Sequence, residues 1–141
     1  MPFGQACLDA LHAALDLGKS MGFETFNHEN YCGTLLWKGE SDTEIGFFGH
    51  ADVVPAGNGW TCCQPFKPVV KDGILIGRGV SDNKGSLMTA LYALRYLKEQ
   101  GYKPKHSFRF FFGCDEEKGM ADVQYYAKNY KEPVSYTHLR A

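Results

Sequence analysis

The chain has no long apolar run and no excess of charge of either sign. No stretch approaches the roughly 20 apolar residues that a membrane-spanning helix needs, and the N-terminus lacks the basic-then-apolar order of a secretion signal. With 15 basic and 16 acidic side chains, the formal net charge is -1, which gives no electrostatic case for nucleic acid or an anionic membrane. We therefore expect neither of them as a partner.

Cysteine occurs in an odd number and without paired spacing. The five thiols belong to Cys7, Cys32, Cys62, Cys63 and Cys114. This pattern does not indicate a disulfide framework, so reduced thiols in a cytoplasmic protein are the simplest interpretation. The adjacent Cys62 and Cys63 have no second Cys or His pair nearby, and we interpret them as incidental rather than as a metal or redox site.

The pattern of apolar residues predicts one α/β domain. The chain has 141 residues, 44% of them hydrophobic, which suffices for a single core, and it contains no internal repeat. Apolar residues at helical spacing predict helices over residues 5–21, 85–100 and 120–129. Aromatic and β-branched runs predict strands over residues 23–26, 31–37, 44–49, 69–71, 74–77 and 106–113. Asp72-Gly73 indicates a hairpin turn, and this order of elements favours a mixed, mostly buried sheet.

Three short segments carry histidine or acidic residues close to the ends of expected strands. They are Gly49-His50-Ala51-Asp52, residues 77–85 and Gly113-Cys114-Asp115-Glu116-Glu117. Imidazole and carboxylate groups are ligands that zinc, cobalt and manganese favour. Side chains at strand ends are placed to form a site rather than to cover a solvated face, so the three segments together point to a metallohydrolase.

Each segment taken alone also has a simpler explanation. His50 and Asp52 face the same way on a strand, so the carboxylate can orient a metal-binding imidazole, but they can also be a surface histidine beside a turn. Asp82 can bridge two metal ions or only cap the helix that follows it. The segment 77–85 does not have the glycine and lysine order of a phosphate-binding loop.

The acidic run after the aromatic strand has the same two interpretations. Asp115, Glu116 and Glu117 can be the acidic start of a helix, but three neighbouring carboxylates repel one another unless a cation or a proton relieves them. Because adjacent side chains point in different directions, one glutamate can bind a metal ion while its neighbour acts as a base. Taken jointly, the segments favour the metal site.

These motifs, in this order, resemble a family of co-catalytic zinc peptidases. The family includes bacterial dipeptidases of the PepV and Sapep type, carnosinases, succinyl-diaminopimelate desuccinylase, acetylornithine deacetylase and the aminoacylases. The resemblance rests on GHADVVPAG from Gly49, on Trp60 with Pro65-Phe66, on GRG from Gly77 with Asp82-Asn83-Lys84-Gly85, and on GCDEE from Gly113. The phrase HADVVPAGNGW is most similar to the bacterial dipeptidases. The resemblance implies a three-layer α/β/α catalytic domain with a mixed, mostly parallel sheet, present here in incomplete form.

The resemblance also assigns roles to five residues. His50 would bind one zinc ion while Asp52 holds its imidazole, Asp82 would bridge two zinc ions, and Glu117 would bind the second. The family carries a cis peptide bond directly after Asp82. Two zinc ions, for which cobalt or manganese can substitute, lower the pKa of a shared water and polarise the scissile carbonyl, and Glu116 would act as general base. The implied activity is hydrolysis of small peptides by a dipeptidase. The alternatives are an amidohydrolase of the deacetylase or desuccinylase kind and a non-catalytic remnant.

The chain departs from the family pattern near its end. The family uses two further ligands, a carboxylate soon after the paired glutamates and a histidine near the end of a much longer chain. Residues 135–141 supply no acid, and His138 is a poor candidate for the histidine. We therefore expect residues 1–134 to be part of a catalytic domain, residues 135–141 to be a foreign tail, and the lid or dimerisation domain to be absent. We expect weak metal binding and negligible hydrolysis from this chain, whereas its parent would be a dipeptidase, with a homodimer as one assembly that the resemblance allows.

Overall fold

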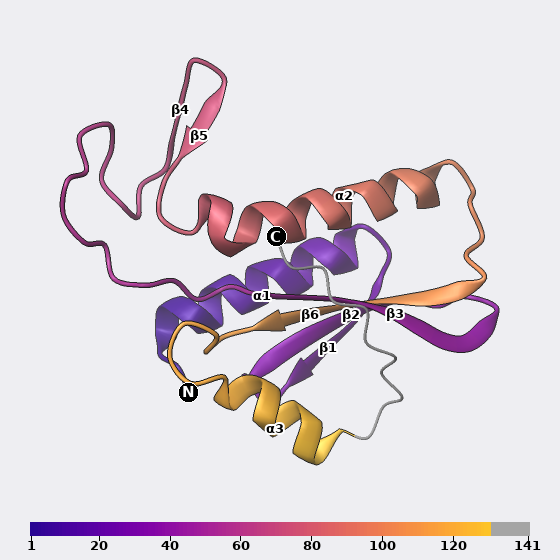
Figure 1. Cartoon of the computed structure of the whole chain (residues 1–141). Helices are drawn as coiled ribbons and strands as arrows, with labels where there is room; N and C mark the ends of the chain where they lie inside the picture. The colour runs from indigo at the N-terminus through magenta and orange to yellow at the C-terminus, as the bar shows by residue number, and fades with distance from the viewer. Residues whose placement is uncertain (131–141) are drawn as a thin grey trace.

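A four-stranded mixed sheet lies between two layers of helices in the computed structural model, which describes residues 1–130 (Figure 1). In chain order the elements are α1 (Gln5–Ser20), β1 (Glu24–His28), β2 (Cys32–Trp37), β3 (Ser41–His50), β4 (Val69–Lys71), β5 (Ile74–Ile76), η1 (Val80–Gly85), α2 (Ser86–Glu99), β6 (His106–Gly113) and α3 (Ala121–Asn129). Apart from η1, which was not expected, these elements agree with those expected from the sequence to within a few residues at their ends. The α/β class is therefore confirmed.

The order of strands in the sheet is β1-β2-β6-β3, so the last strand in sequence is inserted between two earlier ones. Strands β1 and β2, and strands β2 and β6, pair antiparallel, whereas β3 and β6 pair parallel. The sheet is thus mixed as expected, but in residues 1–130 the expectation of a mostly parallel sheet is wrong. A parallel pair of strands needs a long crossover connection. Within residues 1–130, the only connection of this kind between strands of the main sheet is the segment from β3 to β6, which contains α2.

The alternation of side chains along β6 explains the three layers. Phe110 and Phe112 point to one face, where they pack in a buried cluster with leucines of α1 and α2. Phe111 points to the other face and packs with Cys32 and with Tyr126 of α3. Successive residues of a strand face opposite sides, so the three consecutive phenylalanines at positions 110–112 need cover on both faces of the sheet. Helices α1 and α2 cover one face and α3 the other (Figure 1).

Strands β4 and β5 form a separate two-stranded hairpin around Asp72-Gly73, as expected, and this hairpin projects away from the main sheet (Figure 1). Within residues 1–130, no helix has both the length and the apolar character that a bilayer crossing requires. The boundary expected at residue 134, the tail expected over residues 135–141, and His138 all lie outside the described residues.

Candidate metal site

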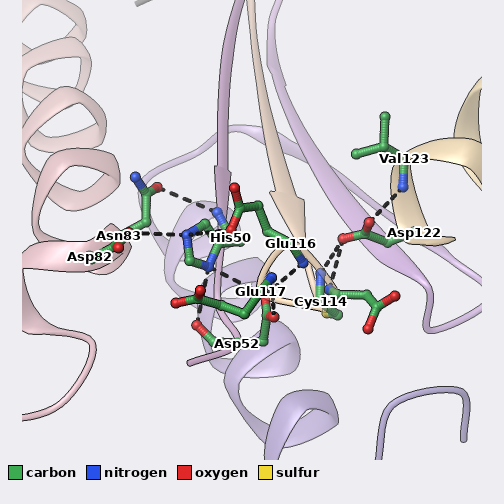
Figure 2. A network of polar contacts seen from close by, with 10 residues as sticks. His50, Asp52, Asp82, Asn83, Cys114, Glu116, Glu117, Asp122 and Val123 are labelled. Atoms are coloured by element: carbon green, nitrogen blue, oxygen red, sulfur yellow. Dashed lines mark hydrogen bonds and ion pairs between the residues drawn. The ribbon is translucent and has the colours of Figure 1, made fainter. Parts of the chain in front are cut away.

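The three acidic or histidine-bearing segments meet at one end of the sheet. His50 is the last residue of β3, and its register partner on the parallel strand β6 is Gly113, directly before the loop that carries Glu116 and Glu117. Asp82 approaches from η1, just before α2 (Figure 2). One ligand atom each of His50, Asp82 and Glu117 lie within 4.8 Å of one another. His50 and the loop that carries Glu116 and Glu117 therefore come together because the parallel strands β3 and β6 end at the same edge of the sheet, and η1 brings Asp82 to that edge.

The His50 ring has two different sides. Its Nδ1 lies 3.3 Å from Oδ1 of Asp52 and 3.1 Å from the Asp52 backbone carbonyl. Its Nε2 lies 3.1 Å from Oδ1 of Asp82 and 3.7 Å from Oε2 of Glu116. His50 is buried, whereas the Asp82 side chain is 76% exposed. One nitrogen is thus held by a buried carboxylate and the other faces a solvent-accessible group of carboxylates.

Asp52 connects His50 to the loop after β6. Its two carboxylate oxygens accept hydrogen bonds from the backbone N–H groups of Glu116 (3.3 Å) and Glu117 (3.1 Å). Burial by itself raises the pKa of Asp52, but hydrogen bonds from His50 and from these two amides outweigh it, so the pKa is lowered. The hydrogen bond to Asp52 in turn raises the pKa of His50 to about 9, against the effect of burial. Without a metal ion, the Asp52 carboxylate therefore favours the protonated form of His50.

The segment that carries Asp82 lies close against β3. The peptide bond between Asp82 and Asn83 is cis, as the resemblance implies. The side-chain oxygen of Asn83 accepts a hydrogen bond from the backbone N–H of His50 at 3.4 Å. A Cβ atom at Gly49 would collide with that oxygen and would lie 2.6 Å from Cγ of Leu87. Glycine at position 49 is therefore what allows η1 to approach the strand end.

Sequence reasoning missed a further acidic residue, Asp122 in the first turn of α3. Its Oδ2 accepts hydrogen bonds from the backbone N–H groups of Cys114 (2.5 Å) and Asp115 (3.0 Å), and the residue is 0% exposed. An acid in the first turn of a helix ordinarily indicates only a favourable interaction with the helix dipole. The signal that could have found it is the spacing of four residues to Tyr126, which places Asp122 on the apolar face of the helix.

The donor set fits a divalent metal ion. It combines one imidazole nitrogen with carboxylate oxygens, the mixture that suits zinc, cobalt and manganese. Asp82, Glu116 and Glu117 converge on one imidazole, and their mutual repulsion is relieved by a proton on His50 or by a bound cation. The exposure of Asp82 leaves the site open on one side, as a hydrolytic metal site requires for water and substrate.

Known proteins similar in sequence match most of this chain. A sequence model of peptidase family M20/M25/M40 matches residues 46–139, which is more than half of the chain. The chain belongs to peptidase family M20/M25/M40. The Beta-Ala-Xaa dipeptidase of Lactobacillus delbrueckii subsp. lactis is 41% identical over 133 residues, which cover 94% of this chain and 28% of that protein. The resemblance to bacterial dipeptidases is thereby confirmed.

Two solved structures share the fold. The metallo-carboxypeptidase Sso-CP2 from Sulfolobus solfataricus superimposes with a TM-score of 0.76 at 21% identity, over 89% of this chain and 30% of its own. Human carnosine dipeptidase 1 gives a TM-score of 0.71 at 22% identity, over 84% of this chain and 28% of its own. At these identities the likeness shows the fold alone. The M20 chain described here thus spans somewhat more than a quarter of the length of such relatives.

Proposed function

We propose that this chain carries part of the two-metal hydrolytic site of an M20 dipeptidase, acting on the peptide bond of small peptides. The observation behind the proposal is the convergence of His50, Asp82 and Glu117 within 4.8 Å in a chain 41% identical to a dipeptidase. In this proposal His50, Asp82 and Glu117 would hold two zinc ions, with His50 and Glu117 each serving one ion and Asp82 shared between them. Cobalt or manganese can take the place of zinc.

Asp52 and Glu116 have the remaining roles. Asp52 accepts the Nδ1–H of His50, so a neutral imidazole keeps the lone pair of Nε2 directed toward Asp82. The Glu116 side chain is 48% exposed, with Oε2 3.7 Å from that nitrogen, so it can take a proton from a water and pass it to the leaving amine. Zinc ions held there would lower the pKa of that water and polarise the scissile carbonyl.

The described residues give an incomplete metal site. His50, Asp82 and Glu117 give each ion only two protein ligands, because Asp82 is counted for both ions, and zinc sites use three or more. We therefore propose that this chain by itself binds metal weakly and hydrolyses peptides negligibly.

The five free thiols also support the proposal of a cytoplasmic location.

Calorimetric titration of the purified chain with zinc and with cobalt tests the metal site. We expect weak binding that is weaker still in Glu117→Ala and unchanged in Glu99→Ala, a glutamate on the exposed surface of α2. Equal binding by wild type and Glu117→Ala would refute the assignment of Glu117. Submicromolar binding of two ions would show instead that the site is complete and that the expectation of a weak site is wrong.

A chimera tests the reaction. In the chimera, this chain replaces the matching 133 residues of the Lactobacillus dipeptidase, which restores the rest of an M20 protein. We expect hydrolysis of dipeptides that Glu116→Gln abolishes while metal binding is retained, because the base acts on the water and does not hold the ion. Hydrolysis of N-acetyl or N-succinyl amino acids, without any hydrolysis of dipeptides, would favour the amidohydrolase alternative.

A further inference from the structure

Asp122 is a fully buried carboxylate outside the set of proposed ligands. It is 0% exposed, and within residues 1–130 no lysine, arginine or histidine forms an ion pair with it. Its oxygens are satisfied by backbone N–H groups, those of Cys114 and Asp115 on Oδ2 and that of Val123 at 2.7 Å on Oδ1. A buried charge is costly unless hydrogen bonds compensate it, so these bonds hold the carboxylate in one place.

Four consecutive amides after β6 are divided between two carboxylates. The N–H groups of residues 114 and 115 bind Asp122, and those of residues 116 and 117 bind Asp52. Asp52 follows β3 and Asp122 belongs to α3, so the loop is held from two different elements of the fold (Figure 2). The backbone that sets the directions of Glu116 and Glu117 is therefore hydrogen-bonded to α3 through Asp122 and to the end of β3 through Asp52.

The position of Asp122 is itself determined by packing. Tyr126, one turn further along α3, is buried against Phe111 of β6. A Cβ atom at Gly113 would collide with Oδ2 of Asp122, so only glycine there lets α3 come this close. The loop also returns a bond to the helix, because Oδ2 of Asp115 accepts the N–H of Ala121 at 3.2 Å.

We propose that Asp122 is a positioning residue for the metal site: its carboxylate holds the backbone of residues 114 and 115 so that Glu116 and Glu117 face His50. The expected effect of Asp122 on metal binding rests on the proposed function. Loss of an outer-shell partner of this kind lowers metal affinity by about 10- to 100-fold. Asp122 would then control the affinity although it contacts neither ion.

The test compares Asp122→Asn with Glu44→Gln in the whole chain. Glu44 forms a partly buried pair with Arg109 at 2.6 and 2.9 Å, in the part of β3 far from His50, so its loss destabilises the fold without touching the loop. We expect Asp122→Asn to speed hydrogen exchange of the amides of residues 114–117, measured by NMR without metal. We also expect a loss of cobalt affinity of about tenfold or more and a changed visible spectrum of the bound cobalt. Glu44→Gln should change neither readout.

Unchanged loop exchange and unchanged cobalt affinity in Asp122→Asn would overturn the proposal, as would an equal loss of affinity in Glu44→Gln. If the wild-type chain binds no cobalt at all, the proposed function fails, and the exchange of the loop amides still decides whether Asp122 holds them. If Asp122→Asn does not fold, Gly113→Ala displaces the same carboxylate while keeping its charge. Full protection of the loop amides in Gly113→Ala would then count against the proposal.

Discussion

Replacing Asp52 by asparagine would disturb three contacts at once while leaving the size of the side chain almost unchanged. Asp52 is 8% exposed, and its oxygens contact Nδ1 of His50 and the N–H groups of Glu116 and Glu117. Asparagine has a single carbonyl oxygen, so at least one of these three donors loses its acceptor. The charge that stabilises the protonated imidazole is lost as well.

The expected cost follows from these contacts. A hydrogen bond to a charged group contributes about 1.5–3 kcal/mol, and the partly solvated surroundings on the Asp82 side of His50 reduce the effect of losing the charge. We expect the free energy of unfolding to fall by about 3 kcal/mol near pH 7. For a chain of this size that corresponds to a melting temperature lower by about 6–12 °C.

The cost should also depend on pH. The pKa of His50 is raised to about 9 in the folded chain, from an ordinary value of 6.5. A raised folded pKa gives stability that is complete below the ordinary pKa and is lost as the pH rises through the folded one. Asp52, whose pKa is lowered, contributes stability above its ordinary range that is lost in acid. The difference between wild type and Asp52→Asn should therefore be larger near pH 6 than near pH 10.

Urea unfolding followed by tryptophan fluorescence, with a chelator present, measures this difference at both pH values. Asp9→Asn, at an exposed aspartate of α1, is the matched control and should cost little at either pH. The same free-energy difference for Asp52→Asn near pH 6 and near pH 10 would refute the reasoning, because it would mean that the imidazole and the carboxylate are not coupled.

Two further predictions need only the metal-free chain and simple assays. Gly49→Ala should lower the free energy of unfolding by about 1–3 kcal/mol, because its methyl group pushes on Asn83. Gly119→Ala, whose added atom meets only an ordinary contact at 3.5 Å, should cost less, and equal costs by urea unfolding would contradict the close packing of η1 on β3. A thiol reagent near pH 8 should label the exposed Cys62 first. Burial raises the pKa of Cys114 to about 12, so we expect Cys114 to be labelled much more slowly than Cys62. Equal labelling rates of the two thiols, measured by peptide mass spectrometry, would contradict the burial of Cys114.

Local chemistry accounts for the features that could be predicted from the sequence. Apolar spacing predicted α1 and α2, and Asp72-Gly73 predicted the β4–β5 hairpin, because each depends on residues close together in the chain. The five candidate site residues were also found in this way, since His50 and Asp52, or Glu116 and Glu117, stand in short motifs. Their meeting at one edge followed from the carboxyl ends of the parallel strands β3 and β6.

Only the tertiary structure decided the neighbours of β6 and the role of α3. Within residues 1–130, β6 lies between β2 and β3, antiparallel to β2 and parallel to β3, and neighbours in a sheet are set by long-range packing rather than by local propensity. Asp122 reads in sequence as an ordinary acid at the start of a helix. Its spacing of four residues to Tyr126 places it on the apolar face of α3, but its contacts with Cys114 and Asp115 depend on the close approach of α3 at Gly113. The sequence does not show which backbone groups packing brings to that face.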